Sequence, residues 1–214
     1  MGNNRRGDIR KRGARIRRYD LGYYVIITDT DRTEKNYFEG FLEKVPSNLK
    51  DRITLKVIKT STKDLIKTAI AVRSEDAQYR KPCIIFDRDQ VKNFDDIVQK
   101  AKELDIVCGW SNPCFEIFLM AYFGKMPSMI NSVQCCQKFS EEFEKKTGQE
   151  YSKADNRLYE KMCKYGNEEN AITISERRKM EFDKNGVTIA SEMQPCTMVY
   201  SLVREINDKI VGKR

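Results

Sequence analysis

The strongest constraint on the fold is a regular alternation of short apolar runs with longer amphipathic segments along the first 125 residues. The apolar runs have the length of strands, and they are Tyr23–Thr28, Ile53–Lys59, Cys83–Phe86 and Ile106–Gly109. Apolar residues recur at helical spacing in four segments, which predicts four helices. These are Thr33–Val45, a segment that begins at Thr62, Phe94–Leu104 and Cys114–Phe123. Strands that alternate with such helices form right-handed βαβ units. The sequence therefore predicts an α/β fold whose mostly parallel, Rossmann-like sheet is flanked by helices.

Beyond residue 125 the pattern becomes mainly helical. We expect a basic arm over 1–20, an α/β core over 21–125, a mainly helical insertion over 126–193 and a C-terminal helix over 194–214 that packs on the core. One apolar stripe of the insertion is expected to be buried, and it consists of Val133, Cys136, Phe139 and Phe143. Near Tyr151 aromatic and basic residues are interleaved. This favours a solvated helix with buried ring edges over a surface that stacks bases.

Two of the predicted strands end in a pair of aspartates. YYVIITDTD closes with Asp29 and Asp31, and CIIFDRD closes with Asp87 and Asp89. Ligands of open parallel sheets bind at the carboxyl ends of strands, and residues two apart on an extended chain point the same way. We therefore expect these four carboxylates to converge on one pocket. The alternative is two ordinary turns, in which aspartate bonds to its own backbone.

The available side chains limit which chemistry this pocket can carry. The chain has no histidine, and its seven cysteines include no C-x-x-C pair. This excludes zinc fingers and the Ser-His-Asp and Cys-His mechanisms. Carboxylate oxygens alone favour hard divalent cations, so we expect Mg²⁺ or Mn²⁺ at Asp29, Asp31, Asp87 and Asp89.

The first 18 residues hold almost all of the net charge. Eight arginines and lysines against one aspartate give this arm +7 of the chain's +8. Such single-sign arms are typically interaction tails that contact nucleic-acid phosphates. The residues expected to make these contacts are Arg10, Lys11, Arg12, Arg15, Arg17 and Arg18. The alternative is a tail that only improves solubility or docks on an acidic face of its own domain.

Nothing in the sequence predicts a membrane or secretory protein. There is no apolar run long enough to span a bilayer and no apolar core of a signal peptide. The cysteines are best interpreted as reduced, small hydrophobic residues. We therefore expect a cytoplasmic protein without a membrane contact.

One enzyme class is suggested by the first acidic pair alone. Asp29-Thr30-Asp31-Arg32-Thr33 matches the opening D-x-D-x-T motif of haloacid-dehalogenase-type phosphatases. In that reading Asp29 is the phosphoryl-accepting nucleophile and Asp31 its general acid/base. The further motifs of that class have no convincing counterparts here, so this hypothesis is the second choice.

Several longer blocks carry a more specific resemblance. RTEKNYFEG, SNPCFEIFLMAYF and QPCTMVYSLVREI, together with the FDRD strand end and the basic start, resemble the RloB / abortive-infection L family of bacterial defence proteins. The resemblance runs in order over nearly the whole chain. It implies a fold related to the Toprim domain, a role against phage and an AAA- or ABC-type ATPase partner. The chain has no Walker P-loop of its own, so an ATP-dependent step would need that partner.

The resemblance also implies which residues act. It implies Mg²⁺- or Mn²⁺-dependent cleavage of DNA or RNA, tRNA included, with catalytic roles for Asp29, Glu34, Asp87 and Asp89 and a site lined by Asn112 and Glu116. For Asn112 there are two interpretations, donation to a phosphate and capping of the following helix, and capping is favoured.

The chain departs from the family at one position that matters for catalysis. Asp29 and Thr30 stand where the family usually has glutamate and glycine. A shorter acid at a catalytic position lowers the rate when geometry is strict. A nucleic-acid-binding module with weakened catalysis is therefore a third hypothesis.

Overall fold

The computed structural model describes residues 23–28, 30, 32–50, 53–57, 63–74, 80–89 and 91–211. The predicted basic arm lies outside the described residues, and so do Asp29 and Asp31. Among the residues that are described, no helix is both long and apolar enough to cross a membrane.

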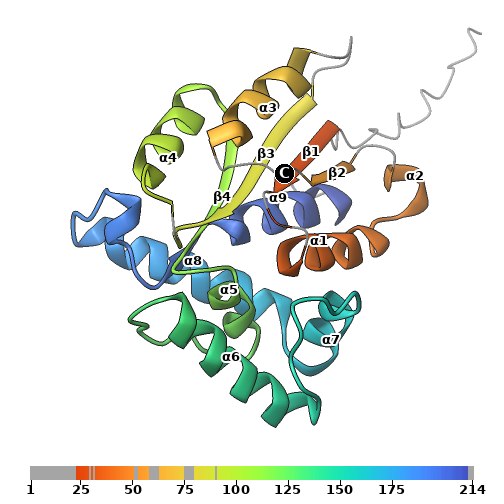
Figure 1. The fold of residues 1–214 in the computed structure, drawn as a ribbon. Helices are drawn as coiled ribbons and strands as arrows, with labels where there is room; N and C mark the ends of the chain where they lie inside the picture. The colour runs from red at the N-terminus through yellow and green to blue at the C-terminus, as the bar shows by residue number, and fades with distance from the viewer. Residues whose placement is uncertain are drawn as a thin grey trace, which may run out of the picture.

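A five-stranded sheet forms the centre of the molecule (Figure 1). Its strands are β1 (Tyr23–Thr28), β2 (Ile53–Val57), β3 (Arg80–Asp87), β4 (Val107–Asn112) and β5 (Cys196–Thr197), in the spatial order β2-β1-β3-β4-β5. The first four are parallel, and only β5 pairs antiparallel, with β4. The predicted mostly parallel α/β architecture is confirmed, and it includes the helical C-terminal part.

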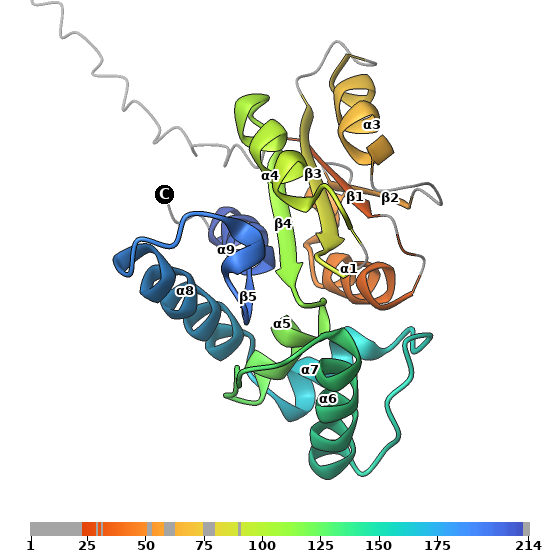
Figure 2. The ribbon, with the colours of Figure 1, turned by 60° about the vertical axis from the view of Figure 1, so that its left-hand side comes forward.

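Helices cover both faces of the sheet (Figures 1 and 2). The helices that pack on one face are α1 (Thr33–Glu43) and α9 (Val199–Val211), and those on the other are α3 (Lys63–Ser74) and α4 (Phe94–Glu103). Alternate residues of β1 supply the two cores. Tyr24 and Ile26 join the core under α1 and α9, whereas Val25 and Ile27 join the core under α3 and α4. This alternation is the period of two that strands impose on their side chains.

A group of helices lies beyond the carboxyl ends of β3 and β4, where Figure 2 shows the strand arrows pointing at α5. The group consists of α5 (Glu116–Tyr122), α6 (Ser132–Thr147), α7 (Leu158–Tyr165) and α8 (Glu168–Lys184). Two short elements complete the described chain, namely α2 (Ser47–Lys50) and the 3-10 helix η1 (Ala190–Glu192). Every residue of α5 is buried, so this helix joins the sheet to the helices outside it.

The last helix is fastened to the first and third strands. The Tyr24 hydroxyl donates to Glu205 Oε1 at 2.6 Å, and Lys81 Nζ lies 2.7 Å from the same oxygen. Val199, Leu202, Val203 and Ile206 are completely buried in the core beneath α9. The C-terminal helix therefore packs against the sheet.

The predicted apolar stripe of α6 is wrong at its first two positions. Val133 is 74% exposed, and Cys136 is only half-buried, whereas Cys135 is completely buried with Phe139 and Phe143. The side chains at 135, 139 and 143 follow the i, i+4, i+8 spacing of one helix face. In the first part of α6, Cys135 is therefore the residue that packs in the core, and its neighbours are not.

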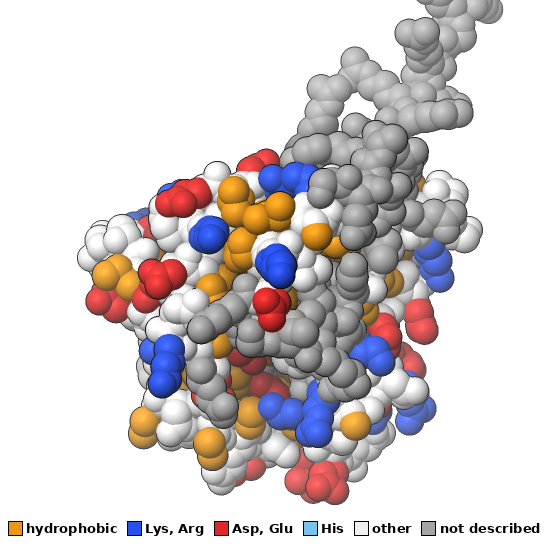
Figure 3. All heavy atoms as spheres, turned by 45° about the horizontal axis from the view of Figure 1, so that its top comes forward, with side chains coloured by type: hydrophobic (Ala, Val, Ile, Leu, Met, Phe, Trp, Pro, Cys, Tyr) orange, Lys and Arg blue, Asp and Glu red, His pale blue; other side chains and the backbone are white. Residues whose placement is uncertain are grey.

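An apolar groove crosses the outer face between α3 and α4. Figure 3 shows hydrophobic side chains gathered there with lysines beside them. The lining includes Ile66, Ile70 and Ile97 with Lys67 and Lys100. Ile70 is 46% exposed, so not every apolar residue of α3 faces the sheet.

Candidate functional site

The acidic strand ends flank the position where the strand order reverses. β1 and β3 are parallel neighbours, and Thr28, the last residue of β1, pairs with Ile85 of β3. β1 is followed by β2 on one side, whereas β3 and β4 lie on the other. A switch in strand order of this kind opens a crevice at the carboxyl ends of the strands. Asp87 ends β3 at this crevice, and Asp29 follows Thr28 in the sequence.

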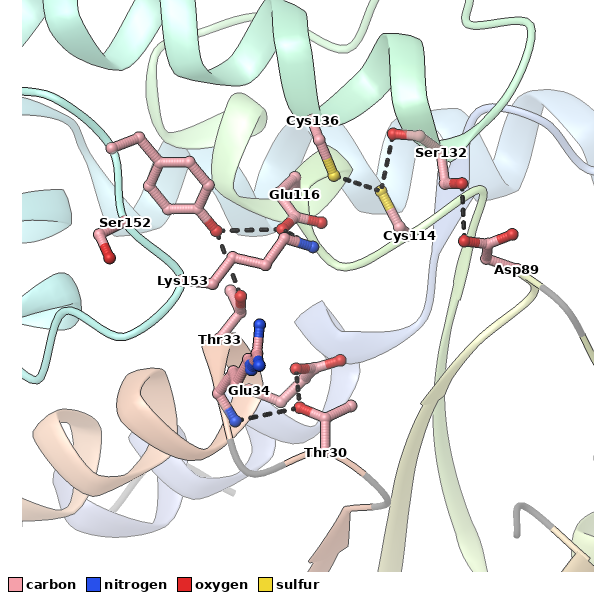
Figure 4. A network of polar contacts seen from close by, with 12 residues as sticks. Thr30, Thr33, Glu34, Asp89, Cys114, Glu116, Ser132, Cys136, Ser152 and Lys153 are labelled. Atoms are coloured by element: carbon pink, nitrogen blue, oxygen red, sulfur yellow. Dashed lines mark hydrogen bonds and ion pairs between the residues drawn. The ribbon is translucent and has the colours of Figure 1, made fainter.

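Asp89 lies in a turn held by the neighbouring connection from β4 to α5. Its carboxylate accepts a 2.7 Å hydrogen bond from Ser132 Oγ at the start of α6 (Figure 4), and its backbone NH donates to the carbonyl of Pro113. The side chain is exposed and lines a polar pocket of about 220 Å³. The Arg88 guanidinium lies 5.9 Å from the centre of the Phe94 ring.

Glu34 is buried in the first turn of α1. It is 3% exposed, and Thr30 Oγ1 donates to its Oε2 at 2.5 Å (Figure 4). The backbone NH of Thr30 in turn donates to Thr28 Oγ1. Thr30 therefore connects the end of β1 with the first turn of α1, where the helix dipole favours a negative charge.

A second acid, Glu116, is buried in the first turn of α5 and bound to a lysine. It is 1% exposed, and its Oε1 lies 2.9 Å from Lys153 Nζ and accepts a 3.0 Å hydrogen bond from Tyr151. The Tyr151 hydroxyl also lies 3.2 Å from Thr33 Oγ1 at the start of α1. These contacts join the loop before α7 to α5 and α1 (Figure 4).

The ion pair sets the protonation states of both partners. Burial acts to raise the pKa of Glu116, but the charge of Lys153 and hydrogen bonds from Lys153 and Cys114 outweigh it, so the pKa lies below 4.5. Burial acts to lower the pKa of Lys153, and the charge of Glu116 raises it overall. At neutral pH the site therefore holds a buried carboxylate and a charged amine whose side chain is 45% exposed.

Lys153 is the residue that the sequence reasoning did not place in the site. It lies in the segment near Tyr151 where aromatic and basic residues are interleaved. The ring of Tyr151 packs edge-on against Phe139, with ring centres 4.7 Å apart, so the ring is partly buried, but Tyr151 lies in the loop before α7 and not in the expected helix. Because 37 positions separate Glu116 from Lys153, no local period connects them. The available signal was the rule that a buried acid requires a cation.

Asn112 was expected to cap the following helix, and this prediction is wrong. Its side-chain amide donates to the carbonyls of Ala190 and Ser191, at 3.3 and 3.0 Å. Phe115 occupies the N-cap position of α5, and no side-chain hydrogen bond caps the helix. Asn112 instead connects the end of β4 to η1 and lines the polar pocket beside Asp89.

The donor set at the strand ends suits a hard cation. Glu34, Asp87 and Asp89 offer only carboxylate oxygens, which is the ligand type that Mg²⁺ and Mn²⁺ prefer. In the part of the chain that the structure describes, these three do not form a cluster with ligand atoms within 4.8 Å of one another. A complete set therefore requires Asp29 or Asp31, and their convergence with Asp87 and Asp89 stays a prediction.

Comparison with known proteins agrees with the motif blocks. Searches of curated proteins and of solved structures find no significant match. A family model described as RloB-like protein matches residues 24–206, which include nearly all of β1, both acidic strand ends, α5 and most of α9. Because the match covers most of the chain, the protein belongs to the RloB-like family.

Proposed function

We propose that this protein is a Mg²⁺- or Mn²⁺-dependent nuclease of a bacterial anti-phage defence system. The observation that carries the proposal is the placement of an acidic turn after β3, beside the end of β1, in a member of the RloB-like family. Acidic turns at a strand-order switch are suited to hold a cation against a phosphate. The proposed substrate is the phosphodiester backbone of DNA or RNA.

The residues divide into metal ligands and groups that act on the phosphate. Asp87 and Asp89, with Asp29 and Asp31, would hold the cation. When bound, the cation polarises the scissile phosphate and lowers the pKa of attacking water. The exposed amine of Lys153 donates to a non-bridging phosphate oxygen, and Glu116 positions that amine. Glu34 accepts a proton or orients the attacking water from the start of α1.

Two partners complete the proposal. The arm over 1–20 would bind the nucleic-acid backbone, since the net charge of +7 on its first 18 residues is suited to release of phosphate counterions. An ATPase partner would supply any nucleotide-driven step.

The decisive experiment compares cleavage by wild type and Asp89→Asn. Plasmid DNA and total RNA are incubated with Mg²⁺, Mn²⁺ or EDTA. We expect metal-dependent cleavage by the wild type and a loss of about 100-fold or more in Asp89→Asn, because the cation loses a charged ligand. Glu141→Gln changes an exposed acid of α6 and is the matched control, which should retain full activity. Equal cleavage by Asp89→Asn and wild type contradicts the proposal.

Asp29→Glu separates the nuclease from the other two hypotheses. The longer side chain restores the glutamate that the family usually has, so nuclease activity should be kept or increased. A phosphatase would lose its nucleophile and stop releasing phosphate from a small phosphomonoester. Nucleic-acid binding without cleavage in both forms would instead identify a binding module.

A further inference from the structure

Two thiols and a carboxylate meet between the β4–α5 connection and α6. The ligand atoms of Cys114, Glu116 and Cys136 all lie within 4.8 Å of one another. Cys114 is 3% exposed, and Cys136 is half-buried on the first part of α6. This group is chemically distinct from the strand-end acids, because it contains soft sulfur donors.

The separation of the two sulfurs fits a shared metal ion. Cys114 Sγ and Cys136 Sγ lie 3.9 Å apart. Two thiolates bound to one tetrahedral zinc ion, each at about 2.3 Å, lie roughly 3.8 Å from each other. A disulfide would require the sulfurs to approach to about 2.05 Å. The observed spacing therefore suits two ligands of one ion with almost no movement.

Glu116 presents a carboxylate oxygen to the thiols. Lys153 and Tyr151 both contact Oε1, and Figure 4 shows the other carboxylate oxygen on the side of Cys114. Cys114 contributes a hydrogen bond to Glu116 that helps to lower the carboxyl pKa. The carboxylate is therefore fixed in place by the lysine and tyrosine while one oxygen faces the sulfurs.

The surrounding charge balances a divalent cation. Deprotonated Cys114 and Cys136 with Glu116 carry three negative charges, and a divalent cation with the Lys153 ammonium carries three positive charges. Because thiolates rather than thiols bind metal ions, binding releases protons and strengthens as pH rises.

We propose that Cys114, Glu116 and Cys136 form a binding site for a thiophilic divalent cation of the Zn²⁺ class. A water molecule supplies the fourth ligand, as in zinc sites with three protein ligands. The half-buried Cys136 and the exposed amine of Lys153 mark the side from which the ion arrives. Mg²⁺ does not compete, because it prefers oxygen ligands.

The test uses Co²⁺ as a spectroscopic substitute for Zn²⁺. The full chain, kept reduced with a phosphine, is titrated with Co²⁺. We expect thiolate-to-cobalt absorption in the near ultraviolet, one ion per chain, displacement by Zn²⁺ and no effect of millimolar Mg²⁺. Cys114→Ser and Cys136→Ser should each lose this signal, and Glu116→Gln should weaken it by at least tenfold. Cys163→Ser removes an exposed thiol of α7 and should leave the signal unchanged.

Two results would overturn this site. The same absorption in Cys114→Ser or Cys136→Ser would place the ion elsewhere. A reduced wild-type chain that binds neither Co²⁺ nor Zn²⁺, and that forms a Cys114–Cys136 disulfide on treatment with peroxide, would make the pair a redox couple instead. Circular dichroism of each variant checks folding, and nuclease activity is not needed for either measurement.

Discussion

The ion pair of Glu116 and Lys153 connects the buried part of the candidate site to solvent. Glu116 is buried and Lys153 is half-exposed, so the amine can reach the proposed phosphate ligand while the carboxylate stays in the protein. An ammonium without its acid would have no fixed position on its flexible stem. The pair therefore explains why an acid is kept in the first turn of an otherwise apolar helix.

This pair makes a prediction about stability and pH. Glu116→Gln should lower the free energy of unfolding at pH 7 by about 1–2 kcal/mol, since charged hydrogen bonds are replaced by neutral ones. The folded pKa of Glu116 is below 4.5, so the carboxylate stabilises the fold above that value and loses this effect as pH falls through the folded pKa. Urea unfolding between pH 7 and pH 3 should show the two proteins converging. A difference that stays constant with pH would contradict the assignment.

For single residues, the sequence predicted those positions that depend on a local pattern of neighbouring residues. Asp87 and Asp89 lie at the end of β3 as expected, because an apolar run followed by two acids has few other interpretations. The roles of Lys153 and Asn112 depend on segments that become neighbours only in the fold. Cys114 and Cys136 were interpreted as small hydrophobic residues, since spacing alone did not bring their sulfurs together.

At the scale of the elements, Gly40 allows α1 to pack closely against α7. A Cβ atom at Gly40 would lie 2.7 Å from Tyr159 Cβ, an atom next to the backbone that cannot swing aside. Tyr159 is 5% exposed and its ring packs edge-on against Phe41 of α1. A larger residue at position 40 must therefore separate the two helices.

Gly40→Ala should destabilise the protein even though alanine favours helices. The gain in helix propensity is about 1 kcal/mol, whereas overpacking costs roughly 1–3 kcal/mol, so we expect a net loss of about 1 kcal/mol. Glu39→Ala, at the neighbouring exposed position, is the control and should change stability by less than about 0.5 kcal/mol. Thermal unfolding measures both. A Gly40→Ala protein as stable as the wild type would refute the close packing.

The elements that the sequence predicted are longer than β5, which it did not predict. The parallel strands and their crossover helices were expected within a few residues, because each has several periods of apolar pattern. β5 contains only Cys196 and Thr197, too few residues to show any period. Its pairing with β4 instead depends on long-range contacts such as the 3.0 Å approach of the Ser111 and Thr197 hydroxyls.

For the whole molecule the charge distribution makes the clearest prediction. Deleting residues 1–18 removes a charge of +7 and leaves the remaining chain close to neutral. Nucleic-acid affinity should fall sharply at low salt and depend less on salt, because each lost phosphate contact lowers the logarithmic slope by about 0.9. Filter binding across a salt series measures this, with Lys138→Ala as a control at an exposed folded position. Unchanged affinity would show that the nucleic-acid-binding surface lies on the folded domain and not on the arm.

The packing of α9 against β1 and β3 affects how the chain folds during its synthesis on the ribosome. The helix that covers Tyr24, Ile26, Cys83 and Ile85 is the last element of the described chain, although those strands are made first. A nascent chain on the ribosome therefore carries a sheet with one partly uncovered apolar face until residues 199–211 have emerged. Such a face is what chaperones bind and what aggregates. Premature termination before α9 should therefore yield a chain that is degraded rather than a smaller folded protein.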